Sequence, residues 1–395
     1  MSADQEDFRE KLRTLGFDEV RFAEAGEVRA DYRDRYSEWL ESGQRADMHW
    51  IDRSFEKRVD PDEVLPGVET IILLGINYLP DEDEPARHQE RWAKYALYHD
   101  YHDTLKKALI DAGKLLETEY GLGDRDYRYY TDTGPLMERG WAARAGLGWQ
   151  GKNGMLISRT HGNWLLLAAI LVRHRFQPDR ALENRKNELP RPAAEVGLLC
   201  GSCTRCIDAC PTKAIVQNGI VDARLCISYQ TIENKGIIPR ELRAKIGNRI
   251  FGCDICLDVC PWNRFAQAGR RLLMTERYDL AELTLPEILT MKQEDFSRIF
   301  AKTPIKRLKW RGLLRNAAIV AGNLRDFPGP DSEAEIAAVI PHLISLVTHD
   351  LAMVRVHAIW AIHRLAPEKA AQFLAEARAE ENDPVVLEEY AFWGM

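Results

Sequence analysis

Two kinds of hydrophobic periodicity alternate along the first half of the chain. Apolar residues recur at helical spacing over residues 8–15 and 105–119, which predicts amphipathic helices. Short apolar or aromatic runs predict strands at residues 19–23, 69–78, 127–131, 155–158 and 164–172. Helices and strands mixed in this way predict an α/β domain over residues 1–190.

From residue 178 onward the composition and the hydrophobic pattern of the chain change twice. Residues 178–195 are polar and rich in Arg, Lys, Glu and Pro, which predicts a linker or a surface insertion. All the cysteines follow, and they define a second domain over residues 191–268. From residue 269 to 395 the pattern is almost purely helical. The predicted fold class is therefore a multidomain α+β protein with three consecutive domains.

Two segments of the helical region resemble one another. Residues 312–325 and 353–365 both place Arg, then Ala, then apolar residues at helical spacing. They lie about forty residues apart, which is the period of HEAT-like helical repeats. Repeats of this kind stack into a curved surface that suits an extended partner. A plain helical bundle is the alternative, because two copies are few for a repeat protein.

Charge is distributed unevenly along the chain. The net charge of −7 argues against a nucleic-acid partner. Residues 296–325, however, carry eight Lys and Arg residues and neither Asp nor Glu. A basic stretch inside an acidic protein predicts a local binding surface for a polyanion. A solvated helix face is the alternative interpretation.

The apolar runs and the N-terminal sequence bear on where the protein resides. No apolar run approaches the roughly 20 residues that span a bilayer. The N-terminal sequence MSADQEDFREKL is acidic and polar, unlike a secretory signal. We therefore expect a cytoplasmic protein without membrane attachment, in a compartment where disulfides rarely persist.

The eight cysteines form two dense runs and one isolated position. The first run has the spacing C-x2-C-x2-C-x3-C before Pro211 and consists of Cys200, Cys203, Cys206 and Cys210. The second run has the spacing C-x2-C-x3-C before Pro261 and consists of Cys253, Cys256 and Cys260, with Cys226 between the two runs. The first spacing is that of bacterial ferredoxins, in which the fourth cysteine ligates the neighbouring cluster.

Applying the ferredoxin rule assigns all eight thiolates to two 4Fe-4S clusters. The first cluster would be held by Cys200, Cys203, Cys206 and Cys260. The second cluster would be held by Cys210, Cys226, Cys253 and Cys256. A zinc site with four cysteine ligands is the alternative, but it would leave four thiols unused. The spacing therefore predicts a redox protein with two clusters.

Several motifs resemble those of the epoxyqueuosine reductase family. The cysteine region contributes CGSCTRCIDACPTKAI at residues 200–215 and IGNRIFGCDICLDVCPWNRFA at residues 246–266. Elsewhere the similar motifs are KRVDP at residues 57–61, DTGPLMERGWAARAGLGWQGKN at residues 132–153 and RGLLRNAAIVAGN at residues 311–323. The resemblance extends from about residue 35 to the last helices.

This resemblance implies a tRNA-modifying enzyme. Members of the family reduce epoxyqueuosine to queuosine at the wobble position of tRNA, and they resemble cobalamin-dependent reductive dehalogenases. The resemblance implies base-off cobalamin in the N-terminal domain, two 4Fe-4S clusters that pass electrons to it, and a HEAT-like C-terminal domain that helps bind the tRNA. We also expect a monomer that takes electrons from an external donor of the ferredoxin or flavodoxin type. A reductase of a small molecule such as an organohalide is the alternative.

The resemblance also assigns site residues. Asp132 matches the family's general acid, for which burial should raise the pKa; a turn-forming Asp is the alternative. The expected cofactor contacts are Arg58, Tyr101, His102, Lys152, Asn153, Leu156, Ser228 and Tyr229. The expected tRNA contacts are Lys302, Lys306, Arg307, Lys309, Arg311 and Arg315.

Overall fold

The computed structural model describes residues 3–26, 30–79, 91–182, 196–267, 269–270, 272–327 and 332–395. These residues form two compact units, each built from three separate stretches of the chain. Unit 1 comprises Met1–Glu84, His99–Arg224 and Asp254–Glu276. Unit 2 comprises Pro85–Tyr98, Leu225–Cys253 and Arg277–Met395. The division into three consecutive domains stays a prediction, and the predicted linker lies outside the described residues from residue 183 onward.

Unit 1 is organised around a four-stranded sheet. The strands run in the order β1 (Glu19–Glu24), β2 (Thr70–Asn77), β6 (Leu165–Val172) and β3 (Tyr127–Tyr130), and every neighbouring pair is antiparallel. All of β2 and the last five residues of β6 are buried, which explains why both strands appear as unbroken apolar runs. The predicted mixture of helices and strands is confirmed, but the sheet does not have the parallel pairing of βαβ units.

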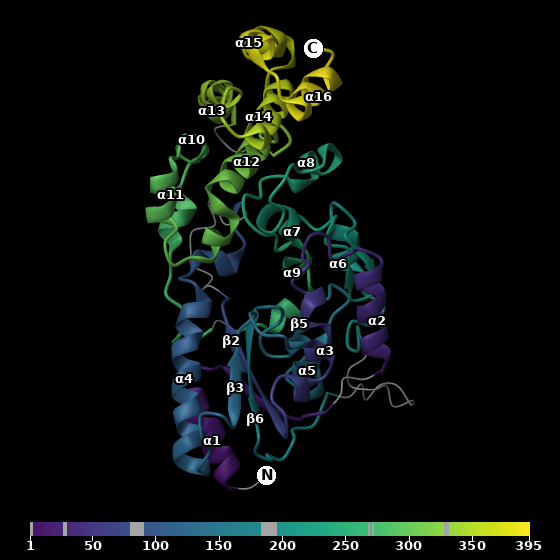
Figure 1. Cartoon of the computed structure of the whole chain (residues 1–395), viewed down its shortest axis with the longest axis vertical. Helices are drawn as coiled ribbons and strands as arrows, with labels where there is room; N and C mark the ends of the chain where they lie inside the picture. The colour runs from purple at the N-terminus through teal and green to yellow at the C-terminus, as the bar shows by residue number, and fades with distance from the viewer. Residues whose placement is uncertain are drawn as a thin grey trace. The chain divides into compact units, whose positions relative to one another are not determined.

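Helices cover both faces of this sheet (Figure 1). On one face, α1 (Ala3–Thr14) packs against β1, and α4 (Tyr101–Tyr120) packs against β3. On the other face, α5 (Glu138–Arg144) packs against β1, β2 and β6. The helices predicted at residues 8–15 and 105–119 are therefore confirmed as parts of α1 and α4.

The remaining elements of unit 1 are mostly short, and several of them carry the candidate site residues. They are α2 (Ala30–Glu41), η1 (Asp52–Ser54), α3 (Phe55–Val59), η2 (Pro61–Glu63), β4 (Trp149–Gln150), β5 (Leu156–Ile157), α6 (Arg205–Ala209), β7 (Ile215–Gln217), β8 (Ile220–Val221), α9 (Ile255–Asp258) and η5 (Pro261–Phe265). β4 pairs with β5 and β7 with β8, both antiparallel. The strand predicted at residues 155–158 is confirmed as β5.

Helices make up most of unit 2, as predicted for the C-terminal region. They are η4 (Lys94–Leu97), α7 (Ile227–Ile232), α8 (Arg240–Ile246), η6 (Tyr278–Glu282), α10 (Leu285–Leu289), α11 (Gln293–Ile299), η7 (Pro304–Leu308), α12 (Lys309–Gly322), α13 (Ser332–Leu346), α14 (Ala352–Leu365), α15 (Pro367–Glu380) and α16 (Pro384–Phe392). α12 and α14 pack closely, and a Cβ atom at Gly322 would lie 2.6 Å from the Trp360 ring. The HEAT-like arrangement stays a prediction. In the described part of the chain, no helix has the length and apolar character needed to cross a membrane.

α12 buries an arginine and an asparagine that find backbone partners. The Arg315 side chain is 0% exposed, and its guanidinium donates hydrogen bonds of 2.7–2.8 Å to three backbone carbonyls, those of Gln230, Asn234 and Gly236. Asn316 donates to the carbonyls of Thr231 and Ile250 and accepts a hydrogen bond from Arg315. We call these two side chains and their carbonyl partners the α12 network. It holds the segment after Cys226 against α12.

Candidate active site

Four of the predicted cluster ligands surround one cavity in unit 1. The cavity has a volume of about 120 Å³, and its lining includes Cys200, Cys203, Cys206 and Cys260. All eight cysteines are half-buried, and none of them forms a disulfide. Burial, and then the charge of Cys200, raise the pKa of the Cys206 thiol to about 11. Thiolates this close repel one another, so a positively charged group between them would stabilise all four.

Two of the expected cofactor residues donate hydrogen bonds to backbone carbonyls of the two cysteine runs, Lys152 to the first run and Asn153 to the second. Lys152 donates hydrogen bonds to the backbone carbonyls of Gly201 (2.8 Å) and Cys203 (3.0 Å). Asn153 is buried, and its side-chain amide donates to the Cys256 carbonyl at 3.3 Å. Both residues also line the cysteine cavity. Leu156, by contrast, is buried in the hydrophobic core beneath the sheet.

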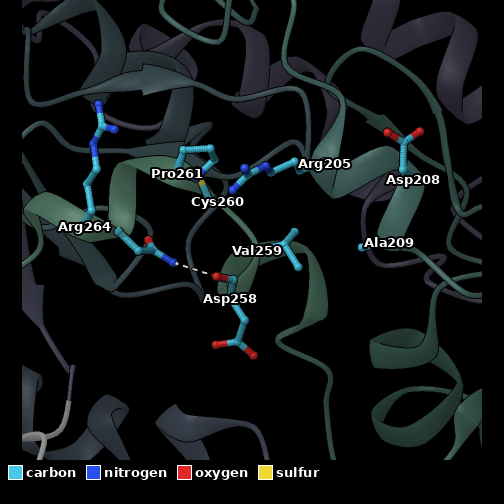
Figure 2. A pocket seen from close by; sticks show the side chains of 9 residues that line it. Arg205, Asp208, Ala209, Asp258, Val259, Cys260, Pro261 and Arg264 are labelled. Carbon is cyan, nitrogen blue, oxygen red and sulfur yellow. Dashed lines mark hydrogen bonds between the residues drawn. The ribbon is translucent and has the colours of Figure 1, made fainter.

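A wider surface opening of about 830 Å³ lies beside Cys260 (Figure 2). Figure 2 shows Arg205 and Arg264 on either side of Cys260 and Pro261. Arg205 also lines the cysteine cavity, so the opening and the cavity share both that arginine and Cys260. A cluster held in the cavity would therefore lie close to the protein surface.

The second predicted ligand set is divided between the two units. Cys210 and Cys256 belong to unit 1, whereas Cys226 and Cys253 belong to unit 2. Within unit 1, the Cys210 sulfur accepts a hydrogen bond from the Ala214 amide at 3.3 Å. No three His, Cys, Asp or Glu side chains among the described residues form a group that could hold a single metal ion. The ligation of a second cluster by these four residues stays a prediction.

Asp132 lies on the loop between β3 and α5, in a strained conformation. Its φ of +53° falls in the left-handed region, which Asp tolerates better than most residues. Its carboxylate accepts a hydrogen bond from the Tyr101 hydroxyl, at the buried start of α4. The side chain is exposed. The burial expected for it, against a bound cofactor and apolar walls, stays a prediction.

His102 lies next to Tyr101 and contributes to the same region. The two rings stack with their centroids 4.1 Å apart. The His102 Nδ1 atom lies 2.7 Å from a carboxylate oxygen of Asp100, which also caps the N-terminus of α4. The expected cofactor residues Tyr101 and His102 are thereby held in place beside Asp132.

A second cavity of about 260 Å³ lies between α2, α3 and α5, and we call it the Glu138 cavity. Arg58 lines it, and the Arg58 Nε atom donates to the Ser54 hydroxyl at 2.9 Å. Three of its lining residues have a buried polar atom without a hydrogen-bond partner among the described residues, namely Tyr36 Oη, Glu138 Oε1 and Gln150 Oε1. Such atoms are rare in folded proteins and indicate a place for a polar ligand, water or proton.

Glu138 was not identified from the sequence. Burial, and then the charge of Asp132, raise the pKa of its carboxyl group to about 7; its own backbone amide, Arg58 and Arg139 oppose this shift. A glutamate in the first turn of a helix is ordinary, because it complements the helix dipole there. The sequence around Glu138 therefore gave no indication that the pKa of its carboxyl group is raised.

The remaining cofactor residues lie in unit 2. Ser228 and Tyr229 belong to α7, which begins immediately after the predicted ligand Cys226. Ser228 is half-buried and Tyr229 is buried. Their predicted contact with a cofactor stays a prediction.

The basic segment divides into exposed and buried residues. Lys302, Arg307, Lys309 and Arg311 are exposed, and Lys306 is half-buried with its ammonium donating to the Ser297 carbonyl. Arg307 pairs with Glu233. Arg315 is removed from the predicted tRNA contacts, because its guanidinium is buried in the α12 network and cannot reach a phosphate. Burial, and then the charge of Arg311, lower the pKa of Arg315 to about 9.

Two family models match the chain. Residues 199–263 match the 4Fe-4S double cluster binding domain, and residues 58–133 match a model described as Epoxyqueuosine reductase QueG, DUF1730. The epoxyqueuosine reductase of Xanthomonas campestris pv. campestris is 37% identical over 372 residues, covering 91% of this chain and 96% of that protein.

Solved structures give a similar result at lower sequence identity. A crystal structure of epoxyqueuosine reductase with an epoxyqueuosine-modified tRNA-Tyr stem loop has a TM-score of 0.83 at 28% identity, covering 98% of this chain and 96% of that one. The epoxyqueuosine reductase of Bacillus subtilis, solved with an aspartate catalytic loop swung out of the active site, has a TM-score of 0.82 at 28% identity over 98% of this chain and 97% of that one.

Proposed function

The chain belongs to the epoxyqueuosine reductase family, and on that basis we propose that it reduces epoxyqueuosine to queuosine in tRNA. It uses two 4Fe-4S clusters as its electron path. The observation that carries this proposal is that unit 1 combines two features. It contains a cavity lined by Cys200, Cys203, Cys206 and Cys260, and it presents an exposed carboxylate, Asp132, held by Tyr101.

The reaction defines what the protein must supply. An epoxide becomes an alkene when its oxygen leaves as water, which consumes two electrons and two protons. Both carbon–oxygen bonds to the same oxygen break, and this oxygen takes up one proton at each cleavage, so that it leaves as water. An exposed acid beside the substrate meets this need, and a positioned acid typically accelerates such a step by about 10²–10⁴-fold.

Asp132 is the group that we assign to protonate the epoxide oxygen. Its side chain is exposed, and the Tyr101 hydroxyl fixes one carboxylate oxygen. The other oxygen is the one that we assign to the substrate. In the relative from Bacillus subtilis, an aspartate catalytic loop has been seen swung out of the active site, which fits a loop that moves during turnover.

The Glu138 cavity fits part of a cobalamin. The edge of a corrin ring carries amide groups, and amides match unpartnered polar atoms such as those of Tyr36 and Gln150. Arg58, which lines the same cavity, would bind a carbonyl of such an amide. Bound cobalamin supplies low-valent cobalt, which delivers electrons to carbon. Tyr101, His102, Ser228 and Tyr229 remain the other predicted contacts.

Electrons would come from an external donor of the ferredoxin or flavodoxin type. The opening beside Cys260 supports this proposal, because a cluster in the adjoining cavity is accessible from that side. The exposed residues Lys302, Arg307, Lys309 and Arg311, together with Lys306, are the surface that we assign to the phosphates of the tRNA.

The direct test uses an RNA stem loop that carries epoxyqueuosine. The anaerobically reconstituted protein, supplied with cobalamin and a reductant, should convert the modified nucleoside to one lighter by a single oxygen atom. Mass spectrometry of the digested RNA measures this conversion. Cys260→Ser should abolish it and halve the iron content, because one of the two clusters is lost.

One control reaction and one contradicting outcome make this test decisive. An organohalide supplied in place of the RNA should remain intact. An unchanged epoxyqueuosine nucleoside, in the presence of fully loaded and reduced clusters, would contradict the proposed function.

A further inference from the structure

Asp132 can deliver one proton at a time, but the proposed reaction consumes two protons and two electrons. The first proton goes to the oxygen as one carbon–oxygen bond breaks, and the two electrons go to the carbon that is released, next to the carbon that keeps the hydroxyl. The second proton lets that hydroxyl leave as water while the electron pair forms the second bond of the alkene. Both protons go to the same oxygen atom, so both must arrive from the same side. Asp132 therefore has to be reprotonated between the two steps unless a second acid reaches the substrate.

We propose that Glu138 stores the second proton and passes it to Asp132, so that one exposed aspartate protonates the departing oxygen twice. Glu138 acts through Asp132 and is therefore a positioning residue rather than a catalytic one. This inference rests on the proposed function and deepens it. It assigns a source to the second proton, which the electron path does not supply.

The position of Glu138 suits this role. It is the first residue of α5, six residues after Asp132 along the same loop. It lines the Glu138 cavity, and its Oε1 atom is buried without a hydrogen-bond partner in the described part of the chain. A buried carboxylate oxygen without a donor is costly when ionised, whereas the neutral acid avoids most of this cost. The site therefore favours a bound proton.

The charges around Glu138 come from several elements. Asp132, on the preceding loop, repels a second negative charge, and this repulsion adds to the effect of burial. Arg58 of α3 and Arg139 of α5 act in the opposite sense. Arg35, Tyr32 and Tyr36 of α2 and Gln150 of β4 complete the polar lining. The balance leaves a carboxyl group that both holds and releases a proton near neutral pH, as a relay must.

Asp132 and Glu138 thus differ in their surroundings. Asp132 is exposed and accepts a hydrogen bond from the Tyr101 hydroxyl, whereas the Glu138 Oε1 atom is buried without a partner among the described residues, which favours the neutral acid. After Asp132 has given its proton to the epoxide oxygen, the remaining proton lies on Glu138. Its transfer to Asp132, directly or through a water molecule in the cavity, restores the acid for the second bond cleavage. Glu138 then takes a proton from solvent.

The test replaces Glu138 with a residue that keeps its shape but carries no acidic proton. In single-turnover reactions of the holoenzyme with the epoxyqueuosine stem loop, Glu138→Gln should slow product formation by about 10²-fold, the lower end for a positioned acid. The wild-type rate should fall as pH rises through about 7, because Glu138 loses its proton there. In Glu138→Gln this inflection should be absent. Glu63→Gln, at an exposed position of η2, is the matched control and should behave as the wild type.

Two further measurements separate a proton relay from a structural role. Infrared titration of the wild type should show a protonated carboxyl band that disappears near neutral pH, and Glu138→Gln should lack this band. Glu138→Asp, which keeps the acid on a shorter side chain, should recover part of the rate. Cluster content and cobalamin retention should be unchanged in both variants.

Several outcomes would overturn the relay. They are a Glu138→Gln enzyme with the wild-type rate and pH profile, a Glu138→Asp enzyme no faster than Glu138→Gln, or a defect explained by lost cobalamin. If the wild type leaves epoxyqueuosine unreduced, the proposed function fails instead. The infrared band then still decides whether Glu138 holds a proton near neutral pH.

Discussion

The α12 network and the Glu138 cavity both bury polar side chains, but they do so in opposite ways. In the network, Arg315 and Asn316 are matched by five backbone carbonyls and by one another. In the cavity, Tyr36, Glu138 and Gln150 each keep a buried atom without a partner among the described residues. Buried polar groups with hydrogen-bond partners stabilise one arrangement of the chain. Buried polar groups without partners are found where a ligand or a reacting group supplies the missing hydrogen bond. The comparison predicts that substitutions in the two regions will have different consequences.

The largest expected effect is on catalysis, at the loop beside the cavity. Asp132→Asn keeps the side-chain shape and tolerates the left-handed backbone, but it cannot give up a proton. Single-turnover reduction should therefore slow by about 10²–10⁴-fold, while clusters, fold and RNA affinity are retained. Thr133→Ala, at the exposed neighbouring position, should have little effect. A near wild-type rate in Asp132→Asn, with electron supply in excess, would make Asp132 a turn residue.

The α12 network should show the opposite behaviour, a loss of stability without a specific chemical defect. Arg315→Leu leaves the carbonyls of Gln230, Asn234 and Gly236 without their donor. Each orphaned buried carbonyl costs about 1–3 kcal/mol, so the free energy of unfolding should fall by about 3 kcal/mol or more. Urea titration of the holoprotein measures this loss. Arg311→Leu, an exposed position one turn earlier in α12, is the control, and equal stability of the two variants would disprove the structural role of Arg315.

The smallest effect should come from the exposed basic residues outside the network. Lys302, Lys309 and Arg311 changed together to Glu should weaken binding of the tRNA stem loop and make it less sensitive to salt. The logarithm of the association constant falls linearly with the logarithm of the salt concentration, and each lost phosphate contact should make this slope less steep by about one unit. Lys106, Lys107 and Lys114 of α4, changed to Glu, provide a control with the same change in net charge. If both triple variants bind equally well, the basic segment is only a solvated face.

The sequence predicted the positions of the strands of unit 1 well, because burial determines where apolar residues occur along a strand. β2 is buried at every position, so residues 69–78 appear as one apolar run, and Thr70–Asn77 form the strand. The order and direction of the strands were not predicted, because pairing depends on contacts between residues far apart in the chain. The cysteines were also informative, since their spacing alone grouped the four that surround one cavity.

Charged residues were harder to interpret, because the same side chain serves at a surface or in a core. Arg315 was grouped with its exposed neighbours in the basic segment, although it is buried. Its surroundings, Leu313 and Leu314 before it and Ala317 and Ala318 after it, were the available sign of burial. Glu138 offered no comparable sign, because its cavity is formed by α2 and α3, more than 75 residues earlier in the chain.

Each compact unit is assembled from three stretches of sequence, and this has a consequence for biosynthesis. Unit 1 lacks its last stretch until Glu276 has left the ribosome, and the last stretch of unit 2 begins only at Arg277. Neither unit is therefore complete while residues 1–275 are being made, unlike a protein whose domains follow one another and fold in turn. The cavity lined by Cys200 and Cys260 cannot close before residue 260 emerges, so cluster assembly at this cavity must wait until the 59 residues between these two cysteines have been made.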